Sequence, residues 1–185
     1  MNHIKVNERI FLVEDFLTPE ECQFYIQFAE NKGFEEATID YGTHHAVERS
    51  IRNNLRVIHD DFDWAKQLWE KLAPYKPTIQ RGDAIGLNER FRIYKYFPGH
   101  RFRLHRDGRY VRNANEWSAY TFMVYLNEVE KGGATRFIRD TFHPKTGMAL
   151  VFAHHLPHEG MKVEAGVKYV LRSDVMFRRN KKKVV

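Results

Sequence analysis

Two potential metal ligands lie two positions apart in the stretch RFRLHRDG, residues 101–108. His105 and Asp107 are separated by a single arginine, and the residues around them are typical of a strand. Because side chains alternate between the two faces of a strand, we expect His105 and Asp107 to point the same way, and Phe102 and Leu104 to point into the opposite layer. An imidazole nitrogen and a carboxylate oxygen suit Fe(II). The pair alone is also typical of a surface histidine beside a solvated aspartate, so a metal site requires a third ligand.

The C-terminal third of the chain offers candidates for that ligand. Four histidines compete for the role: His143, His154, His155 and His158. Two histidines and one carboxylate form the facial triad that holds Fe(II) and leaves coordination positions open. His158 is followed ten residues later by Lys168, on a segment with strand composition. A cation at that distance could lie beside the metal and receive the distal carboxylate of a chelating keto acid.

The N-terminal part is expected to supply helices that support this site. Thr18 is a good N-cap, Pro19 occupies the first helical position and Glu21 completes a capping box, so a helix is predicted that ends near Gly33. A second helix is predicted from an apolar stripe that Pro74 closes, formed by Phe62, Ala65, Leu68, Trp69 and Leu72.

From about residue 87 the chain changes to short runs rich in aromatic and β-branched residues, which predict strands. The runs are RFRIYKYF, RFRLHRD, AYTFMVYLNEV, ATRFI, MALVFAH and VKYVLRSDVMF. Helices followed by six short strands predict a sandwich or barrel core with helices packed outside it.

The stretch from about residue 35 to residue 54 has weak periodicity and predicts a long loop or an irregular hairpin. It contains Tyr41, Gly42, His44, His45, Arg49 and Arg52. Long loops in compact domains are often lids, so the segment could close over a substrate. The alternative is a fixed hairpin on the barrel in which Arg49 and Arg52 are merely solvated.

Length, charge and cysteine content limit the class of protein. A chain of 185 residues predicts one domain. Most of the net charge of +6 lies in a short basic tail, which we expect to be solvated rather than to bind nucleic acid. No apolar run approaches the ~20 residues of a membrane span, and the N-terminus lacks a secretory signal, so a cytoplasmic protein is expected. The single cysteine, Cys22, permits no internal disulfide.

Three ordered motifs resemble the 2-oxoglutarate- and Fe(II)-dependent oxygenases, specifically their prolyl 4-hydroxylase-like branch, over about residues 85 to 177. YKYFPGHRFRLHRDG resembles the Tyr-x-Pro-Gly segment that leads into H-x-D. MVYLNEVEKGGATRF resembles the YLN…GG-x-T-x-F segment, and HEGMKVEAGVKYVLRSDV resembles the distal histidine with its Gly-x-Lys segment.

The resemblance assigns roles to individual residues. It implies that His105, Asp107 and His158 bind iron and that Lys168 binds the C5 carboxylate of 2-oxoglutarate. It also implies a hydrogen bond from Tyr125 to that carboxylate and a place near the site for Tyr96, although both tyrosines could be plain core aromatics. Arg172 shares a strand face with Lys168 and is the alternative cation. The histidines assigned structural or surface positions are His44, His45, His154 and His155.

The implied fold is a double-stranded β-helix, a mainly β jelly roll of the cupin type within the α+β class, with N-terminal helices packed outside. One oxygenase domain would span residues 1–185, with helical support over about 1–80, the catalytic core over about 81–178 and a basic tail over 178–185. The implied cofactors are Fe(II), 2-oxoglutarate and O2, with ascorbate as a candidate reductant. The implied reaction hydroxylates an unactivated C–H bond and releases succinate and CO2.

The leading candidate substrate is a prolyl residue in a protein or peptide, with no nucleic acid and no membrane as partner. A small-molecule oxygenase or a nucleic-acid demethylase of the same superfamily is an alternative, but the demethylases have an R-x-N-x-T-F-R ending that KYVLRSDVMFRR lacks. A non-catalytic cupin-like binding module is the alternative outside enzymology.

Overall fold

The computed structural model describes residues 1–40 and 45–180 of the chain. Its helices are α1 (Pro19–Lys32), α2 (Phe62–Leu72) and the short 3-10 helix η1 (Ala73–Tyr75). Its strands are β1 (Asn2–Asn7), β2 (Ile10–Glu14), β3 (Glu35–Glu36), β4 (Ile39–Asp40), β5 (His45–Ala46), β6 (Leu55–Asp60), β7 (Gly82–Leu87), β8 (Arg90–Tyr96), β9 (Phe102–His105), β10 (Val111–Asn113), β11 (Glu116–Tyr125), β12 (Lys131–Gly132), β13 (Thr135–Phe137), β14 (Thr141–Phe142), β15 (Ala149–Ala153), β16 (His158–Gly160), β17 (Val163–Ala165) and β18 (Lys168–Arg179).

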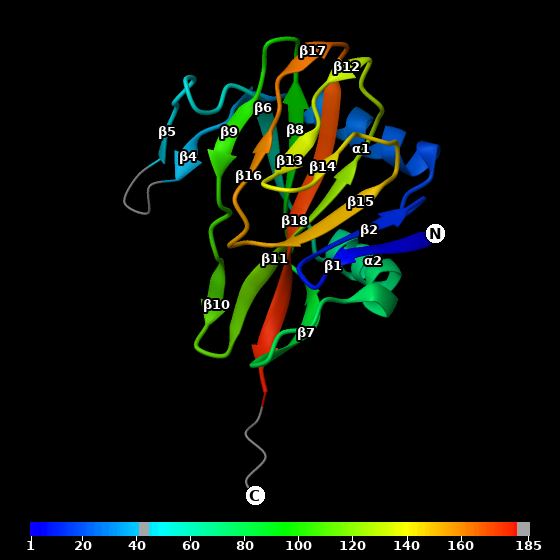
Figure 1. The fold of residues 1–185 in the computed structure, drawn as a ribbon, viewed down its shortest axis with the longest axis vertical. Coiled ribbons are helices and arrows are strands. Elements are labelled where there is room, and N and C mark those ends of the chain that lie inside the picture. Colours follow the sequence, from blue (N-terminus) through cyan, green and yellow to red (C-terminus); the bar gives the residue numbers. More distant parts are fainter. Residues whose placement is uncertain (41–44, 181–185) are drawn as a thin grey trace, which may run out of the picture.

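Two antiparallel sheets form the jelly roll. The larger one runs in the order β1-β2-β15-β11-β18-β8-β6-β3, with β10 beside β11 and β7 beside β18. The smaller one runs β14-β13-β16-β9 and lies in front of the larger sheet in Figure 1, with α1 and α2 behind it. Several neighbouring strands in both sheets come from distant parts of the sequence, such as β11 and β18 or β9 and β16, as the crossing connections of a double-stranded β-helix require. The fold is therefore the predicted one.

The larger sheet carries different side chains on its two faces, because residues alternate along each strand. Phe122 and Val124 of β11 and Leu171 of β18 belong to the core under the helices, together with Leu68 and Leu72 of α2. Their neighbours along the strands point the other way, into the space between the sheets. These inner residues form a second core that includes Tyr94, Tyr96, Met123, Tyr125, Phe152 and Val170.

Both predicted helices are confirmed, with one error in the second. Thr18 caps α1, accepting from the backbone N–H of Glu21 while the Glu21 carboxylate accepts from the backbone N–H of Thr18. Helix α2 begins after Asp61, whose carboxylate accepts from the backbone of Trp64. Phe62 was predicted to face the core but is 73% exposed, because it lies in the first turn on the outer face.

The six predicted strands are present as β8, β9, β11, β13, β15 and β18. Residues 1–80 were expected to supply helical support, but strands occupy part of that range. The hairpin of β1 and β2 extends the larger sheet along β15, and β6 pairs with β8. These strands were missed because β1 is almost fully exposed and gives no apolar alternation, while β6 alternates only partly.

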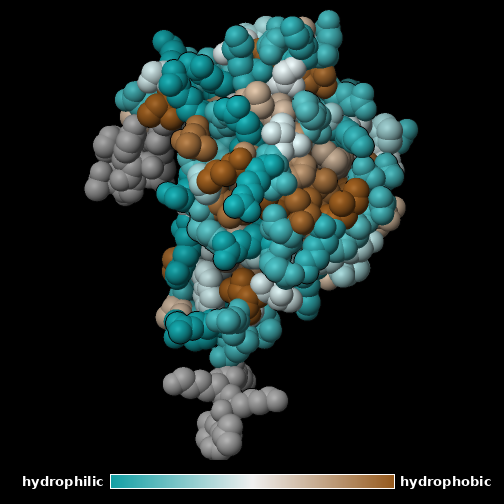
Figure 2. All heavy atoms as spheres, viewed as in Figure 1, coloured by the Kyte–Doolittle hydropathy of each residue, from teal (hydrophilic) through white to brown (hydrophobic). Residues whose placement is uncertain are grey.

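The surface on the side of the smaller sheet is mostly hydrophilic. Figure 2 shows its apolar side chains in several separate patches rather than in one continuous area. Among the described residues, no helix is long and apolar enough to cross a membrane.

Candidate active site

His105, Asp107 and His158 come together between the two sheets. Each offers one ligand atom, and these atoms all lie within 4.8 Å of one another. His105 ends β9 and lies directly opposite His158 of β16 in the strand register. Asp107 follows β9 rather than belonging to it, and its backbone N–H donates to the carbonyl of His154. The predicted alternation along a strand therefore breaks after His105, although the two side chains still point the same way.

The side chains next to this pair are not oriented as predicted. Phe102 was expected in the opposite layer, but its ring stacks on His105 with centroids 3.5 Å apart and lines the cavity. The strand register shifts between His158 and Gly160 where β16 pairs with β9, and this irregularity disturbs the simple period of two. Leu104 points outward and is exposed.

Backbone carbonyls fix how the two histidines present their rings. The Nδ1 of His105 lies 2.7 Å from the carbonyl of Arg103, and the Nδ1 of His158 lies 3.0 Å from the carbonyl of Leu156. A carbonyl only accepts, so Nδ1 carries the proton and the lone pair is on Nε2. Both Nε2 atoms lie 3.7 Å from Asp107 oxygens. This is the arrangement that orients histidine ligands in metal sites.

Asp107 is held as a carboxylate. Burial opposes its charge, but Arg172, whose Nη2 lies 3.2 Å from Oδ1, and the two histidines hold its pKa well below the usual range. The hydroxyl of Thr121 donates to Oδ2. Burial also lowers the pKa of His158 to about 4, so this imidazole is neutral at physiological pH. A carboxylate and a neutral imidazole are the protonation states that the ligands of a divalent metal require.

The donor set therefore fits Fe(II). Two imidazole nitrogens and one carboxylate oxygen are grouped at one end of a cavity of about 690 Å³, which leaves room for further ligands. His154 and His155 are not part of the group, as predicted. His154 is buried beside Asp174, with Nε2 3.5 Å from Oδ1, and His155 is exposed.

Lys168 is a buried cation in the wall of the same cavity. Its side chain is 2% exposed, and no carboxylate of the described residues pairs with it. Its Nζ donates to the carbonyl of Gly133 at 2.6 Å and lies over the rings of Tyr96 and Tyr125 at 5.2 and 5.3 Å. Burial lowers its pKa to about 7. A cation that lacks a protein counter-charge in a cavity is a receptor for an anionic ligand.

The two tyrosines assigned to this pocket differ in their contacts. Tyr96 lies directly opposite Lys168 in the register of β8 and β18 and lines the cavity. Tyr125 is fully buried, and its hydroxyl donates to Thr135 at 2.7 Å. Thr135 lines the cavity as well. Gly133 has φ +70°, and a Cβ there would lie 3.3 Å from Cδ of Lys168, so a glycine allows the turn to close on the lysine.

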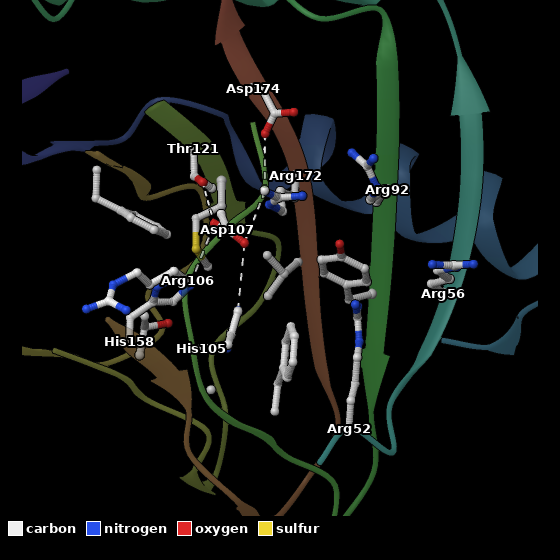
Figure 3. A pocket seen from close by; sticks show the side chains of 18 of the residues that line it. Arg52, Arg56, Arg92, His105, Arg106, Asp107, Thr121, His158, Arg172 and Asp174 are labelled. Atoms are coloured by element: carbon white, nitrogen blue, oxygen red, sulfur yellow. Dashed lines mark hydrogen bonds and ion pairs between the residues drawn. The ribbon is translucent and has the colours of Figure 1, made fainter. Parts of the chain in front are cut away.

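Arg172, the alternative cation, lies at a different place. It shares a face with Lys168 as predicted, but it is already neutralised by Asp107 and by Asp174, each 3.2 Å from its Nη2. Figure 3 shows this chain of contacts between Asp174, Arg172, Asp107 and His105. Despite burial, the two carboxylates raise the pKa of Arg172. Its position indicates support for Asp107 rather than capture of a ligand.

The segment over residues 35–54 forms an irregular hairpin in its described part. Strand β3 pairs with β6, and β4 pairs with β5. Arg49 is exposed and pairs with Glu36, but Arg52 does not fit the alternative in which both arginines are merely solvated. It is 7% exposed and lines the cavity, because its chain position pairs with Phe102 in an isolated bridge. Tyr41, Gly42 and His44 lie outside the described residues, and the lid stays a prediction.

The part of the chain that carries the site matches a known protein family. The 2OG-Fe(II) oxygenase superfamily profile matches residues 91–173, which include the three candidate ligands and Lys168. Over these residues the chain is similar to the 2OG-Fe(II) oxygenase superfamily, and it is prolyl 4-hydroxylase-like. It is a 2-oxoglutarate-dependent dioxygenase, and enzymes of this family use Fe(II), 2-oxoglutarate and O2.

Individual relatives agree with this assignment. A candidate prolyl 4-hydroxylase of Acanthamoeba polyphaga mimivirus is 25% identical over 92% of this chain and 74% of its own. A second candidate, from Arabidopsis thaliana, is 29% identical over 70% of this chain, which spans 41% of that relative. A prolyl hydroxylase from Trichoplax adhaerens, solved with a hypoxia inducible factor peptide, has the same fold, with a TM-score of 0.70, 15% identity and coverage of 95% and 86%.

Proposed function

We propose that this chain hydroxylates a prolyl residue in a protein or peptide and converts 2-oxoglutarate to succinate and CO2. The observation that carries the proposal is the pairing, in one cavity, of a facial triad with a buried cation that lacks a carboxylate partner among the described residues. Such a pair suits a keto acid, which chelates a metal at one end and carries a carboxylate at the other. The peptide is supported by the relatives, whose names are those of prolyl hydroxylases.

His105, Asp107 and His158 would hold the iron, and Lys168 would hold the C5 carboxylate of 2-oxoglutarate. When bound, the iron supplies oxygen activation and the oxidising power for hydroxylation of a C–H bond. The other contributions belong to the chain itself. Leu156 and Arg103 carbonyls keep the imidazole Nε2 atoms aimed at the metal position. Thr121 and Arg172 fix the Asp107 carboxylate and keep it ionised.

The apolar and aromatic walls limit water around the reacting groups. Phe102, Phe152 and Tyr96 line the cavity beside the histidines, and Phe137 and Phe152 contact the ring of His158. Burial beside these aromatic side chains strengthens the charge-assisted contact between Lys168 and a carboxylate, since water screens the interaction only weakly there. We further propose that residues 1–185 act as one oxygenase domain, because strands from 1–80 complete the sheet that carries the site.

Succinate formation tests the reaction class without knowledge of the target. The purified protein should convert 2-oxoglutarate to succinate slowly without substrate, in a reaction that requires added Fe(II) and O2. The His158→Ala protein should form none, and the His155→Ala protein, altered at an exposed neighbouring histidine, should match the wild type. Succinate formation by His158→Ala at the wild-type rate would contradict the proposed site.

A further inference from the structure

Positive charge dominates the cavity lining. Two aspartates face eight basic side chains: Arg52, Arg56, Arg90, Arg92, Arg106, Arg109, Lys168 and Arg172. Several of these cations are already compensated. Arg90 forms a bidentate pair with Asp60, Arg172 lies between two carboxylates, and Arg106 donates to the carbonyl of His155. Three others, Arg52, Arg56 and Arg92, are called the arginine cluster below.

The arginine cluster lies on β8, on β6 and just before β6, across β18 from the metal ligands (Figure 3). Arg92 of β8 is directly opposite Arg172 of β18 in the register. Arg56 of β6 is directly opposite Tyr94 of β8. Like charges directly opposite one another destabilise a sheet. Arg172 has two carboxylate partners, but among the described residues no carboxylate forms an ion pair with any member of the cluster, so an external anion would compensate the charge of the cluster.

Each member has a buried N–H group with no acceptor in the described part of the chain: Nη2 of Arg52, Nε of Arg56 and Nη1 of Arg92. Two of these side chains are nevertheless held in place. Nε of Arg52 donates to Asn54 at 2.7 Å, and its guanidinium lies 4.7 Å from the ring centroid of Tyr94. Nη2 of Arg56 donates to Thr38 at 2.9 Å. A buried donor left without an acceptor is destabilising, so these groups form a prepared anion site.

The electrostatics of Tyr94 agree with this interpretation. Burial alone would raise the pKa of its phenol, but Arg52, Arg172 and Arg92 lower it to about 8. Burial is the main cause that lowers the pKa of Arg56; Arg52 and Arg92 lower it further, while Tyr94 and Glu35 oppose the shift. The wall formed by β8 and β6 is therefore strongly positive.

We infer that the arginine cluster binds a carboxylate of the substrate, so that the hydroxylated residue lies close to a glutamate or aspartate in the peptide. This inference rests on the proposed peptide hydroxylase function. Neighbouring strands are about 4.8 Å apart and successive Cα atoms about 3.8 Å apart, so the acidic residue lies within about three positions of the target. A nucleic acid would instead need a row of accessible basic side chains, whereas the cluster offers buried donors in the wall of one cavity.

Peptide binding tests the inference. Two labelled peptides contain the same central proline and differ only in glutamate or glutamine beside it, and a single-stranded DNA of equal negative charge serves as the third probe. Binding to the anaerobic protein with Fe(II) and 2-oxoglutarate is followed by fluorescence anisotropy, and succinate formation is measured on the same preparation. We expect the glutamate peptide to bind about tenfold more tightly than the glutamine peptide, as one charge-assisted contact provides.

Variants show which arginines cause the preference for the glutamate peptide. Arg92→Gln and Arg52→Gln should remove most of it, while Arg90→Gln, on the same strand but neutralised by Asp60, should keep it. Equal binding of the two peptides by a wild-type protein that forms succinate would overturn the inference and leave the proposed function standing. A glutamate preference without any succinate would support the anion site and overturn the proposed function. Tighter binding of the DNA than of either peptide would overturn the choice of a peptide.

Discussion

At the scale of single residues, the site depends on how each ligand is oriented rather than on the ligands alone. The Nδ1 atoms of His105 and His158 are engaged by carbonyls, and Asp107 is held by Thr121 and Arg172. Of these, only the three ligands could be found from the sequence, through their spacing and the resemblance. Thr121 and the carbonyls could not, because their contacts depend on which strands become neighbours.

Loss of a ligand should separate metal binding from folding. In His158→Ala, turnover should fall to background and Fe(II) affinity at least about tenfold, while the protein stays folded, because His158 belongs to neither hydrophobic core. Anaerobic calorimetry and a melting curve measure the two quantities. Essential His154 together with an active His158→Ala protein would show that the third ligand is misassigned.

Lys168 should make 2-oxoglutarate binding depend on pH. Burial lowers its pKa to about 7 in the free protein, and a bound carboxylate favours the charged form. Below pH 7 the lysine is already protonated, so affinity should be flat with respect to this group. Above pH 7 binding must take up a proton, and the dissociation constant should rise by up to about tenfold per pH unit.

The control for this prediction is Lys168→Arg, because a guanidinium stays charged over the whole range. Its dissociation constant for 2-oxoglutarate should not rise above pH 7, whatever its absolute value. Titrations of the anaerobic Fe(II) protein between pH 6 and pH 9 measure both proteins. The same slope in both would show that another group titrates.

At the scale of elements, β18 connects the helical core with the site. Leu171 packs under the helices while Lys168, Arg172 and Asp174 line the cavity from alternate positions. The sequence shows this alternation, and it correctly placed Arg172 on the face of Lys168. The sequence could not show that two carboxylates neutralise Arg172, because Asp107 contacts it from another segment of the chain.

Removal of Arg172 should destabilise the fold strongly. Arg172→Met leaves Asp107 and Asp174 buried near each other without a cation, which should cost about 3–5 kcal/mol. Arg178→Met on the same strand breaks only a surface pair with Glu116 and should cost far less. Urea denaturation compares the two, and equal losses would contradict a structural role for Arg172.

At the scale of the whole molecule, the order of helices and strands predicted the fold class, and the ordered motifs predicted the position of the site. The N-terminal hairpin of β1 and β2 and the buried position of Arg52 were not predictable. An exposed edge hairpin has little apolar pattern, and an arginine in a polar stretch gives no sign that aromatic rings will enclose it.

The central claim is that this cavity hydroxylates a prolyl residue with oxygen derived from O2 and at the expense of 2-oxoglutarate. Mass spectrometry of proline-containing peptides incubated with the enzyme, Fe(II) and 2-oxoglutarate tests it most directly. We predict a gain of one oxygen atom located on proline by fragmentation, equimolar with succinate and absent from the His158→Ala reaction. Oxygen incorporated only at another residue type, or equally by His158→Ala, would contradict the account.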